Sequence, residues 1–224
     1  MYTAEMTGMR QNSQLPTYDK RKDLFMKIIG ITGGVGAGKS TVLNMLKELC
    51  RCEVIMADDV AKEIMVQKGE LSDTAVRLFG KKAYLPDGSL NRPYIAGLIY
   101  GDENLRKKWD DAVHPVVNDR IFSMIGKCRE EGIYDFVFVE AALLIENHYD
   151  EICDEIWYIY ASAQTRKKRL LLQRNYSGEE SDNIMKRQMS DKEFREHCSF
   201  VINTECDMEH MRKVLKNRLE EYEN

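Results

Sequence analysis

The sequence lacks any long apolar run. No stretch of 18 or more apolar residues occurs, which argues against a membrane-spanning helix. The first segment, residues 1–24, is polar and mixed in charge, and without an apolar centre it does not read as a secretory signal. Two interpretations of this segment stay open, a disordered extension or a start site placed too far upstream. We expect a cytoplasmic protein without a membrane partner.

Cysteine and histidine are too scattered to form a metal site. The six cysteines include no C-x-x-C pair, and Cys50 and Cys52 are two positions apart, the wrong spacing for a zinc knuckle. The four histidines include no H-x-x-x-H pair. We therefore expect reduced cysteines in a cytosolic protein and no structural metal held by the protein.

An excess of positive charge is also missing. Lys plus Arg number 33 and Asp plus Glu number 37, which gives a net charge of −4. A protein that grips nucleic-acid backbone is normally basic, so we predict no nucleic-acid partner, although a local basic pocket for a phosphorylated substrate stays open. With 224 residues, 43% of them hydrophobic, the chain fits one compact domain with an inserted lobe.

Short β-rich apolar segments alternate with helical patterns along the chain, which favours an α/β fold with a five-stranded parallel sheet. The expected strands are residues 27–32, 53–56, 134–140, 155–160 and 199–203. The expected helices are residues 40–50, 60–80 with a break at Gly69, 92–130 with a break at His114-Pro115, 164–174, 179–189, 191–197 and 208–222. Ligands of such folds bind at the carboxyl ends of the strands, here residues 32–34, 57–59, 140–142, 161–163 and 203–205.

The most specific motif lies between the first strand and the first helix. Residues 33–40 read Gly-Gly-Val-Gly-Ala-Gly-Lys-Ser and match the phosphate-binding pattern G-x-x-x-x-G-K-[ST]. Glycines let the backbone wrap an anion, and the helix that follows places its positive end beneath the phosphates. Lys39 would neutralise the β- and γ-phosphates, and the Ser40 hydroxyl would bind Mg²⁺. The motif predicts a nucleoside triphosphate site.

The rest of the sequence favours a small kinase among the proteins with this loop. The guanine-reading tetrapeptide N-K-x-D is missing, which disfavours a GTPase, and the chain is too short for a large motor ATPase. A kinase also needs an acceptor pocket, a carboxylate that acts as a base, and a basic lid.

Candidate carboxylates stand at the expected binding edge. Asp58 and Asp59 follow the second strand and would accept a proton or bind Mg²⁺, with helix capping as an equally open alternative. Glu140 ends the third strand, where a carboxylate could hold Mg²⁺ through water. Glu146 follows on the same loop, and a solvated or capping acid remains an alternative there.

Basic residues crowd the expected lid, with residues 175–178 as a hinge between its helices. A single basic residue in this segment is consistent with a solvated helix face. The whole cluster beside the glycine loop favours a lid that closes on phosphate. His114 is either a capping or packing residue or a ligand-binding one. The basic residues of the cluster are Arg166, Lys167, Lys168, Arg169, Arg174, Lys186 and Arg187.

Taken in order, these segments resemble the dephospho-coenzyme A kinase family over about residues 27–216. The resemblance implies a P-loop NTPase three-layer fold in residues 25–224, with a helical acceptor-binding lobe near residues 60–130 and a short helical lid near residues 164–190. It implies transfer of the ATP γ-phosphate to the ribose 3′-hydroxyl of dephospho-CoA, the last step of coenzyme A biosynthesis. The segments that carry the resemblance are residues 31–41, 54–58, His114-Pro115, 140–146, 164–174, 187–188 and 200–203.

The resemblance also implies roles for single residues. Asp58, Lys39 and Arg174 would be catalytic, and Mg²⁺ would sit on Ser40. Departures from the family pattern fall at Met56, Glu140 and Ala142, where the family has Asp, Asp and Pro. Residues expected to hold ATP are Gly33, Gly34, Val35, Gly36, Ala37, Gly38, Lys39, Ser40, Thr41, Arg174 and Asn203, the last near the adenine. Residues expected to hold the acceptor are Asp58, His114, Glu140, Leu143 and Arg187.

We therefore expect an active kinase with ATP, Mg²⁺ and dephospho-CoA as its ligands, acting as a monomer or weak homo-oligomer. Two other functions stay open at this point. One is a kinase for a different small molecule, a nucleotide or a sugar. The other is a regulatory module that binds ATP without catalysis.

Overall fold

The structure is a computed structural model that describes residues 26–141, 144–145, 149–174 and 176–222. The extension expected at residues 1–24 lies outside the described residues, as does the loop position Leu143. No helix in the described ranges is long and apolar enough to cross a membrane.

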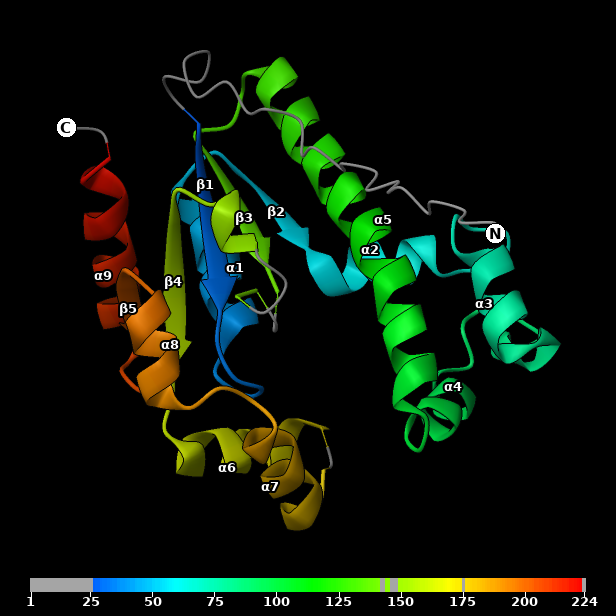
Figure 1. Ribbon diagram of the computed structural model, residues 1–224. Helices are drawn as coiled ribbons and strands as arrows, with labels where there is room; N and C mark the ends of the chain where they lie inside the picture. The colour runs from blue at the N-terminus through cyan, green and yellow to red at the C-terminus, as the bar shows by residue number, and fades with distance from the viewer. Residues whose placement is uncertain (1–25, 142–143, 146–148, 175, 223–224) are drawn as a thin grey trace, which may run out of the picture.

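A five-stranded sheet, parallel throughout, forms the centre of the molecule, which confirms the predicted fold class (Figure 1). The strand order is β2-β3-β1-β4-β5, so the glycine loop leaves the sheet from its middle strand. In the register of the sheet, Ile31 of β1 lies beside Glu140 of β3, and Met56 of β2 lies on the other side of Glu140. The strands are β1 (Lys27–Thr32), β2 (Cys52–Met56), β3 (Phe136–Glu140), β4 (Glu155–Tyr160) and β5 (Phe200–Asn203).

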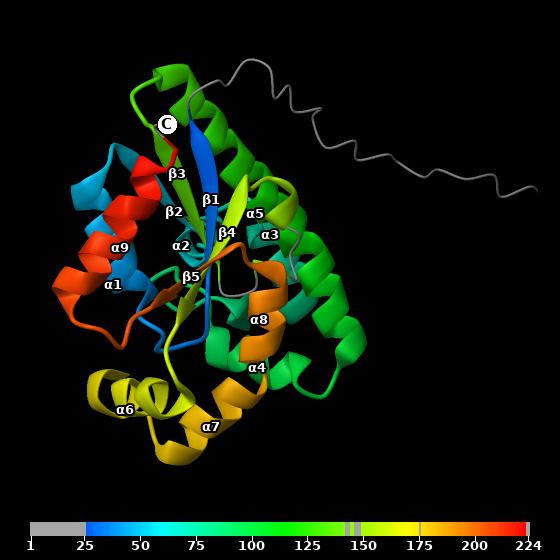
Figure 2. The same ribbon diagram turned by 90° about the vertical axis from the view of Figure 1, so that its left-hand side faces the viewer.

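Helices cover both faces of the sheet, and side chains along each strand alternate between the two cores. Helices α1 (Lys39–Leu49) and α9 (Met208–Glu220) cover one face, where Ile29 is buried against them. The neighbouring Ile28 belongs to the opposite core, on the side of the long helix α5 (Glu103–Glu131) (Figure 2). The result is the three-layer arrangement that the sequence predicted.

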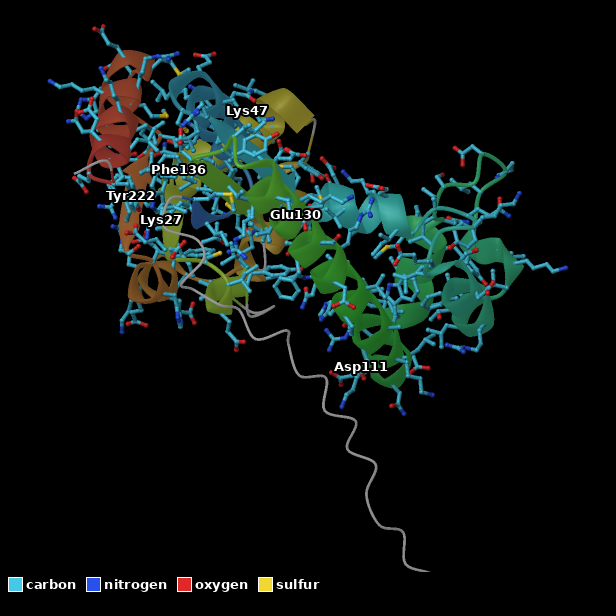
Figure 3. The ribbon with its side chains drawn as sticks, turned by 90° about the horizontal axis from the view of Figure 1, so that it is seen from above. Lys27, Lys47, Asp111, Glu130, Phe136 and Tyr222 are labelled. Carbon is cyan, nitrogen blue, oxygen red and sulfur yellow. The ribbon has the colours of Figure 1, made fainter. Side chains whose placement is uncertain are left out.

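A helical lobe projects from the sheet beside β2. Its helices are α2 (Ala57–Ile64), α3 (Ser72–Phe79), α4 (Arg92–Ile99) and α5, with a short 3₁₀ turn, η1, at Lys81–Ala83. Figure 3 shows how α5 joins the two parts: Glu130 lies beside the sheet, whereas Asp111 lies far out in the lobe. The segment predicted as one helix with a break, residues 60–80, forms the pair α2 and α3, with Gly69 in the turn between them. The segment 92–130 forms the pair α4 and α5.

The expected break of the helix at His114-Pro115 is wrong. Helix α5 continues through Pro115 without interruption. A proline inside a helix removes one backbone hydrogen bond and costs about 3 kcal/mol. Buried residues on both sides of it offset that cost, because Val113 and Val117 lie on the same buried stripe as Ile121 and Ile125. Tertiary packing thus overrides the local preference at this position.

The segment predicted to be a lid, near residues 164–190, forms two helices beyond the carboxyl ends of the strands (Figure 1). They are α6 (Ala163–Arg174) and α7 (Gly178–Lys186), and α8 (Asp191–His197) then leads back to β5. A second 3₁₀ turn, η2, lies at Tyr149–Glu151 before β4. Both α7 and α8 begin with a capping box, in which Ser177 pairs with Glu180 and Ser190 pairs with Glu193.

Candidate active site

The glycine loop adopts a conformation that only glycine tolerates at several positions. Gly33, Gly36 and Gly38 have φ angles of 144°, 76° and 98°. A Cβ on Gly33 would lie 2.4 Å from the carbonyl oxygen of Ile159, so the start of the loop passes directly over β4. Gly38 stands at the N-cap of α1 and brings no side chain to cap it. The first N–H groups of α1 are therefore available to an anion.

Lys39, the lysine of the loop, folds back across it. Its Nζ donates to the Gly33 carbonyl oxygen at 2.8 Å and lies 3.3 Å from Oε1 of Glu140. Glu140 is only 6% exposed, and this burial raises the pKa of its carboxyl group, an effect that the positive charge of Lys39 partly offsets. The pair therefore places a cation and an anion at the point where β1 and β3 end.

The two aspartates after β2 have different environments. Helix α2 begins at Ala57, three residues earlier than expected, so Asp58 and Asp59 both lie in its first turn. The N-cap is Met56 and no side chain caps the helix, so capping does not account for either aspartate. Asp59 pairs with Lys62 at 2.6 Å, whereas Asp58 has no hydrogen bond or ion pair within the described residues. Asp58 is thus an exposed, uncommitted carboxylate.

One cavity of about 690 Å³ joins these groups. It brings together the glycine loop from Gly34 to Thr41 with Asp58 and Glu140, as the positions at the carboxyl ends of β1, β2 and β3 predicted. Its hydroxyl and carboxylate oxygens, from Ser40, Asp58 and Glu140, are the hard donors that Mg²⁺ prefers. The cavity is lined further by Met56, Asp59, Lys62, Arg169, Leu170, Gln188, Thr204, Cys206, Met208 and Met211.

Four described residues of the predicted site, Gly33, Asn203, His114 and Arg187, lie outside this lining. Asn203 ends β5, is exposed, and accepts a hydrogen bond from the N–H of Glu205 at 2.9 Å. His114 is exposed on α5, Arg187 is exposed at the end of α7, and Arg174 is the last residue of α6. Leu143 and Glu146 lie outside the described residues.

Two sets of hydrogen bonds that the sequence does not predict hold the glycine loop in place. Nη1 of Arg169 donates to the carbonyl oxygens of Gly36 and Ala37 at 3.2 and 3.1 Å, and to Oγ1 of Thr204 at 2.9 Å. Its Nη2 donates to the Thr204 carbonyl oxygen at 2.8 Å. Thr204 Oγ1 in turn donates to the Ala37 carbonyl oxygen at 2.6 Å. These hydrogen bonds hold the carbonyl oxygens of Gly36 and Ala37 and so fix the backbone of the loop, while the first N–H groups of α1 remain for a ligand.

Arg166 and Gln188 form a second contact, at the start of the loop. Nε of Arg166 donates to the Val35 carbonyl oxygen at 2.9 Å, and the N–H of Val35 donates to Oε1 of Gln188 at 3.1 Å. The spacing of Arg166 and Arg169 along one helix was the available signal in the sequence, and Thr204 lies at the carboxyl end of β5, where ligands were expected. Neither the helical spacing nor the position at a strand end predicts that these side chains contact the glycine loop.

Comparison with known proteins places this geometry in context. A sequence profile of the dephospho-CoA kinase family matches residues 27–210. The dephospho-CoA kinase of Dehalococcoides mccartyi is 35% identical over 202 residues, covering 87% of this chain and 99% of its own. That of Geobacter sulfurreducens is 32% identical over 196 residues, covering 88% and 96%.

Solved structures agree in fold. A crystal structure of a Thermus thermophilus protein superposes with a TM-score of 0.74 at 26% identity, covering 88% of this chain and 98% of its own. The dephospho-CoA kinase from Campylobacter jejuni superposes with a TM-score of 0.65 at 19% identity, covering 88% and 96%. At that identity the second likeness concerns the fold alone.

Proposed function

The chain belongs to the dephospho-CoA kinase family, and from this premise we propose which of its residues carry the family's reaction. The enzyme is a phosphotransferase that moves the γ-phosphate of ATP to the ribose 3′-hydroxyl of dephospho-CoA, the final step of coenzyme A biosynthesis. The observation that carries the assignment is the shared cavity. It holds the glycine loop, the Lys39–Glu140 pair and the uncommitted carboxylate of Asp58.

The glycine loop holds the triphosphate of ATP. Backbone N–H groups at the start of α1 donate to phosphate oxygens, and the positive end of the helix dipole adds to this attraction. Lys39 exchanges its contact with the Gly33 carbonyl oxygen for the β- and γ-phosphates. Glu140 keeps the lysine oriented, because a buried carboxylate 3.3 Å from Nζ restricts where the ammonium group can go.

Asp58 aims and deprotonates the acceptor. Its carboxylate faces the same cavity as the glycine loop and is held by no other side chain that the structure describes. A free carboxylate near the γ-phosphate can accept the proton of the ribose hydroxyl as the oxygen attacks. Asp59 is unsuited to this role, because Lys62 already pairs with it.

Ser40 and Glu140 would hold Mg²⁺, with the hydroxyl of Ser40 as a direct ligand and Glu140 acting through water. When bound, the ion neutralises charge on the phosphates. The protein's own contribution is to set hard oxygen donors at the start of α1 and at the end of β3, beside the glycine loop.

The remaining assignments complete the proposal. Arg174 and Arg187 close over the phosphates from the lid, and Asn203 lies near the adenine. His114 and Leu143 contact dephospho-CoA from the acceptor side. The kinase domain spans residues 25–224, with the acceptor lobe near residues 60–130 and the lid near residues 164–190, and it works in the cytoplasm as a monomer or weak homo-oligomer.

A coupled assay of ADP release tests the acceptor. The purified protein with ATP and Mg²⁺ should release ADP in the presence of dephospho-CoA, and much less with adenosine, nucleoside monophosphates or sugars. Faster release with one of those acceptors would identify a different small-molecule kinase. ATP binding without ADP release for any acceptor would identify a regulatory module. The variant Lys39→Ala controls for contaminating kinases, because it keeps the same purification history.

A further inference from the structure

The first turns of α6 place a guanidinium group directly on the glycine loop. A Cβ on Gly34 would lie 2.2 Å from Cζ of Arg166, so any side chain at this position would displace the guanidinium. Nε of Arg166 donates to the Val35 carbonyl oxygen at 2.9 Å, and its Nη2 donates to Oε1 of Gln188 at 2.5 Å. The structure thus joins the lid to the opening residues of the loop through Arg166.

Oε1 of Gln188 is held by two donors at once. Besides the guanidinium, the backbone N–H of Val35 donates to the same oxygen at 3.1 Å. Val35 and Gln188 both line the cavity. An oxygen shared between a loop N–H and an arginine has the partners that a phosphoryl oxygen takes in such sites. Gln188 therefore supplies a neutral oxygen at a position suited to a charged one.

Arg166 has no negative charge beside it. It is half-buried, and no carboxylate forms an ion pair with it within the described residues. Other arginines of the chain do pair with carboxylates, as Arg120 does with Glu63 and Arg218 with Glu155. Arg169 likewise has no ion pair among the described residues, so the missing counter-charge leaves room for an anionic ligand at Arg166 without requiring one.

The position of Lys39 shows which phosphate would reach Arg166. Its Nζ lies 2.8 Å from the Gly33 carbonyl oxygen, two residues before Val35 in the loop. In this motif the lysine contacts the β- and γ-phosphates. The start of the loop, where Arg166 and Gln188 meet Val35, is therefore the side of the γ-phosphate.

We propose that Arg166 is a further catalytic residue and that Gln188 holds its place before ATP binds. This inference rests on the proposed function. On ATP binding, a γ-phosphoryl oxygen replaces Oε1 of Gln188 between Nη2 of Arg166 and the N–H of Val35. The bond from Pγ to the bridging oxygen of ADP then breaks as the bond to the ribose 3′-oxygen forms. Asp58 takes the hydroxyl proton, and Arg166 stabilises the charge on the transferring group.

The exchange is favourable because charged oxygens make stronger hydrogen bonds than amide oxygens. A guanidinium–phosphate contact is roughly twice as strong as a contact between neutral groups, so the γ-phosphate outcompetes the amide of Gln188. ADP lacks a γ-phosphate and leaves Gln188 in place. Arg166 therefore distinguishes ATP from ADP, whereas the N–H groups at the start of α1 bind both.

Comparison of ATP and ADP affinities in Arg166→Gln tests this role. We expect kcat to fall by about 10²-fold or more, since one charged donor to the transferring group is lost. Affinity for ATP, measured by calorimetry, should fall, while affinity for ADP stays within about threefold of wild type. The matched control is Lys192→Gln, which removes a positive charge from an exposed site on α8 and should change neither. Equal losses for ATP and ADP would overturn the inference and leave Arg166 a structural role, and so would unchanged kcat.

Two further variants keep the test decisive if Arg166→Gln fails to fold. Arg166→Lys keeps the charge but not the planar group, and should recover part of the lost kcat. Gln188→Ala removes the competing oxygen, so affinity for ATP should rise severalfold while affinity for ADP stays constant; weaker ATP binding would overturn the place-holding role. Wild-type turnover of dephospho-CoA is measured in parallel. Its absence would refute the proposed function, whereas the two affinities still test Arg166.

Discussion

The glycine loop and the helical lobe are held in place in different ways. On the proposed nucleotide side, polar side chains from distant segments hold the glycine loop, as Arg169 and Thr204 do at Gly36 and Ala37. The lobe of α2 to α5, which is the proposed acceptor side, is held largely by apolar packing, with Trp109 against Phe79 at a ring distance of 5.1 Å. Hydrogen bonds thus fix the loop, and buried surface fixes the lobe.

This difference corresponds to the two tasks proposed for the two regions, which are binding ATP and binding the acceptor. A loop whose carbonyl oxygens are tied down keeps its backbone in one conformation before ATP arrives, so only the side-chain contacts of Lys39 and Gln188 have to be exchanged there. The lobe also has hydrogen bonds between its helices, such as that from the Tyr94 hydroxyl to the Phe79 carbonyl oxygen, while His114 is exposed on its surface. We infer that the nucleotide side is preorganised and that the acceptor side takes its polar contacts from the substrate.

Lys39→Ala should produce the largest effect on the nucleotide side. The β- and γ-phosphates lose their cation and Glu140 loses its partner, so kcat/KM should fall about 10³-fold or more, or about 4 kcal/mol. Steady-state ADP release measures the loss. Lys47→Ala, an exposed lysine on the same helix, is the matched control. Retention of more than a tenth of the wild-type rate would show that the loop does not bind ATP as described.

Asp58→Asn should stop the chemical step while leaving the nucleotide side intact. Loss of the base should lower kcat by about 10²- to 10³-fold with little change in the KM for ATP. The neighbouring variant Asp59→Asn is the comparison, because that carboxylate pairs with Lys62 and should cost much less. Equal losses in the two variants would contradict the assignment of the base.

Arg169→Gln should remove the hydrogen bonds by which Arg169 holds the glycine loop in place. Four hydrogen bonds of a half-buried guanidinium are lost, so we expect the free energy of unfolding to fall by about 2–3 kcal/mol. Affinities for ATP and ADP should fall together by about 10-fold or more, because the loop serves both. Thermal unfolding and calorimetry measure the two effects. Lys168→Gln, an exposed neighbour on α6, controls for the loss of charge. A lower affinity for ATP with an unchanged affinity for ADP would show that these hydrogen bonds do not support the loop.

Glu155→Gln should weaken the attachment of α9 to the sheet without changing either ligand site. Burial tends to raise the pKa of Glu155, but hydrogen bonds from its neighbours, including Arg218, outweigh this and hold the pKa below its usual value. A carboxyl group whose pKa is depressed on folding stabilises the protein above its unfolded pKa. The variant should therefore lose about 1 kcal/mol at neutral pH.

Urea unfolding of wild type and Glu155→Gln at several pH values measures that difference. The gap should stay constant above about pH 5 and close as the pH falls through the folded pKa of Glu155. A gap that widened on acidification would contradict the sign of the shift.

His114→Ala should give the smallest effect, confined to the acceptor side. The side chain is exposed, so the free energy of unfolding should change by no more than about 0.5 kcal/mol. If His114 contacts dephospho-CoA as predicted, the KM for this acceptor should rise about 3- to 10-fold while the KM for ATP stays constant. An unchanged KM for both substrates would remove His114 from the acceptor site.

The conformation of the glycine loop can be predicted from local sequence because its motif is contiguous. The glycines, Lys39 and Ser40 lie within eight residues, 33–40, and their conformation follows from backbone sterics and the helix that they begin. The hydrogen bonds of Arg169 and Thr204 to the loop cannot be predicted in this way. Arg169 and Thr204 are 35 residues apart and reach the loop more than 130 residues back in the chain, so only the folded sheet brings them together.

The acceptor side was harder for the same physical reason. The break expected at Pro115 rested on the backbone of two residues, whereas the buried stripe on either side of it decides the helix. The apolar pattern predicts that α2 begins at residue 60, three residues late, and so does not show that Asp58 and Asp59 share one helical turn. Lobe residues contact each other across separate helices, so a periodic pattern shows which side chains are buried and not what they meet.

Identification of the product tests the central claim most directly. Wild-type protein is incubated with ATP, Mg²⁺ and dephospho-CoA, and the acceptor product is analysed by mass spectrometry and phosphorus NMR. One added phosphoryl group on the ribose 3′-oxygen, formed in step with ADP, is the predicted result. Phosphate released to water, or attached at any other position of the acceptor, would contradict a cavity in which Asp58 directs the 3′-hydroxyl at ATP held by the glycine loop.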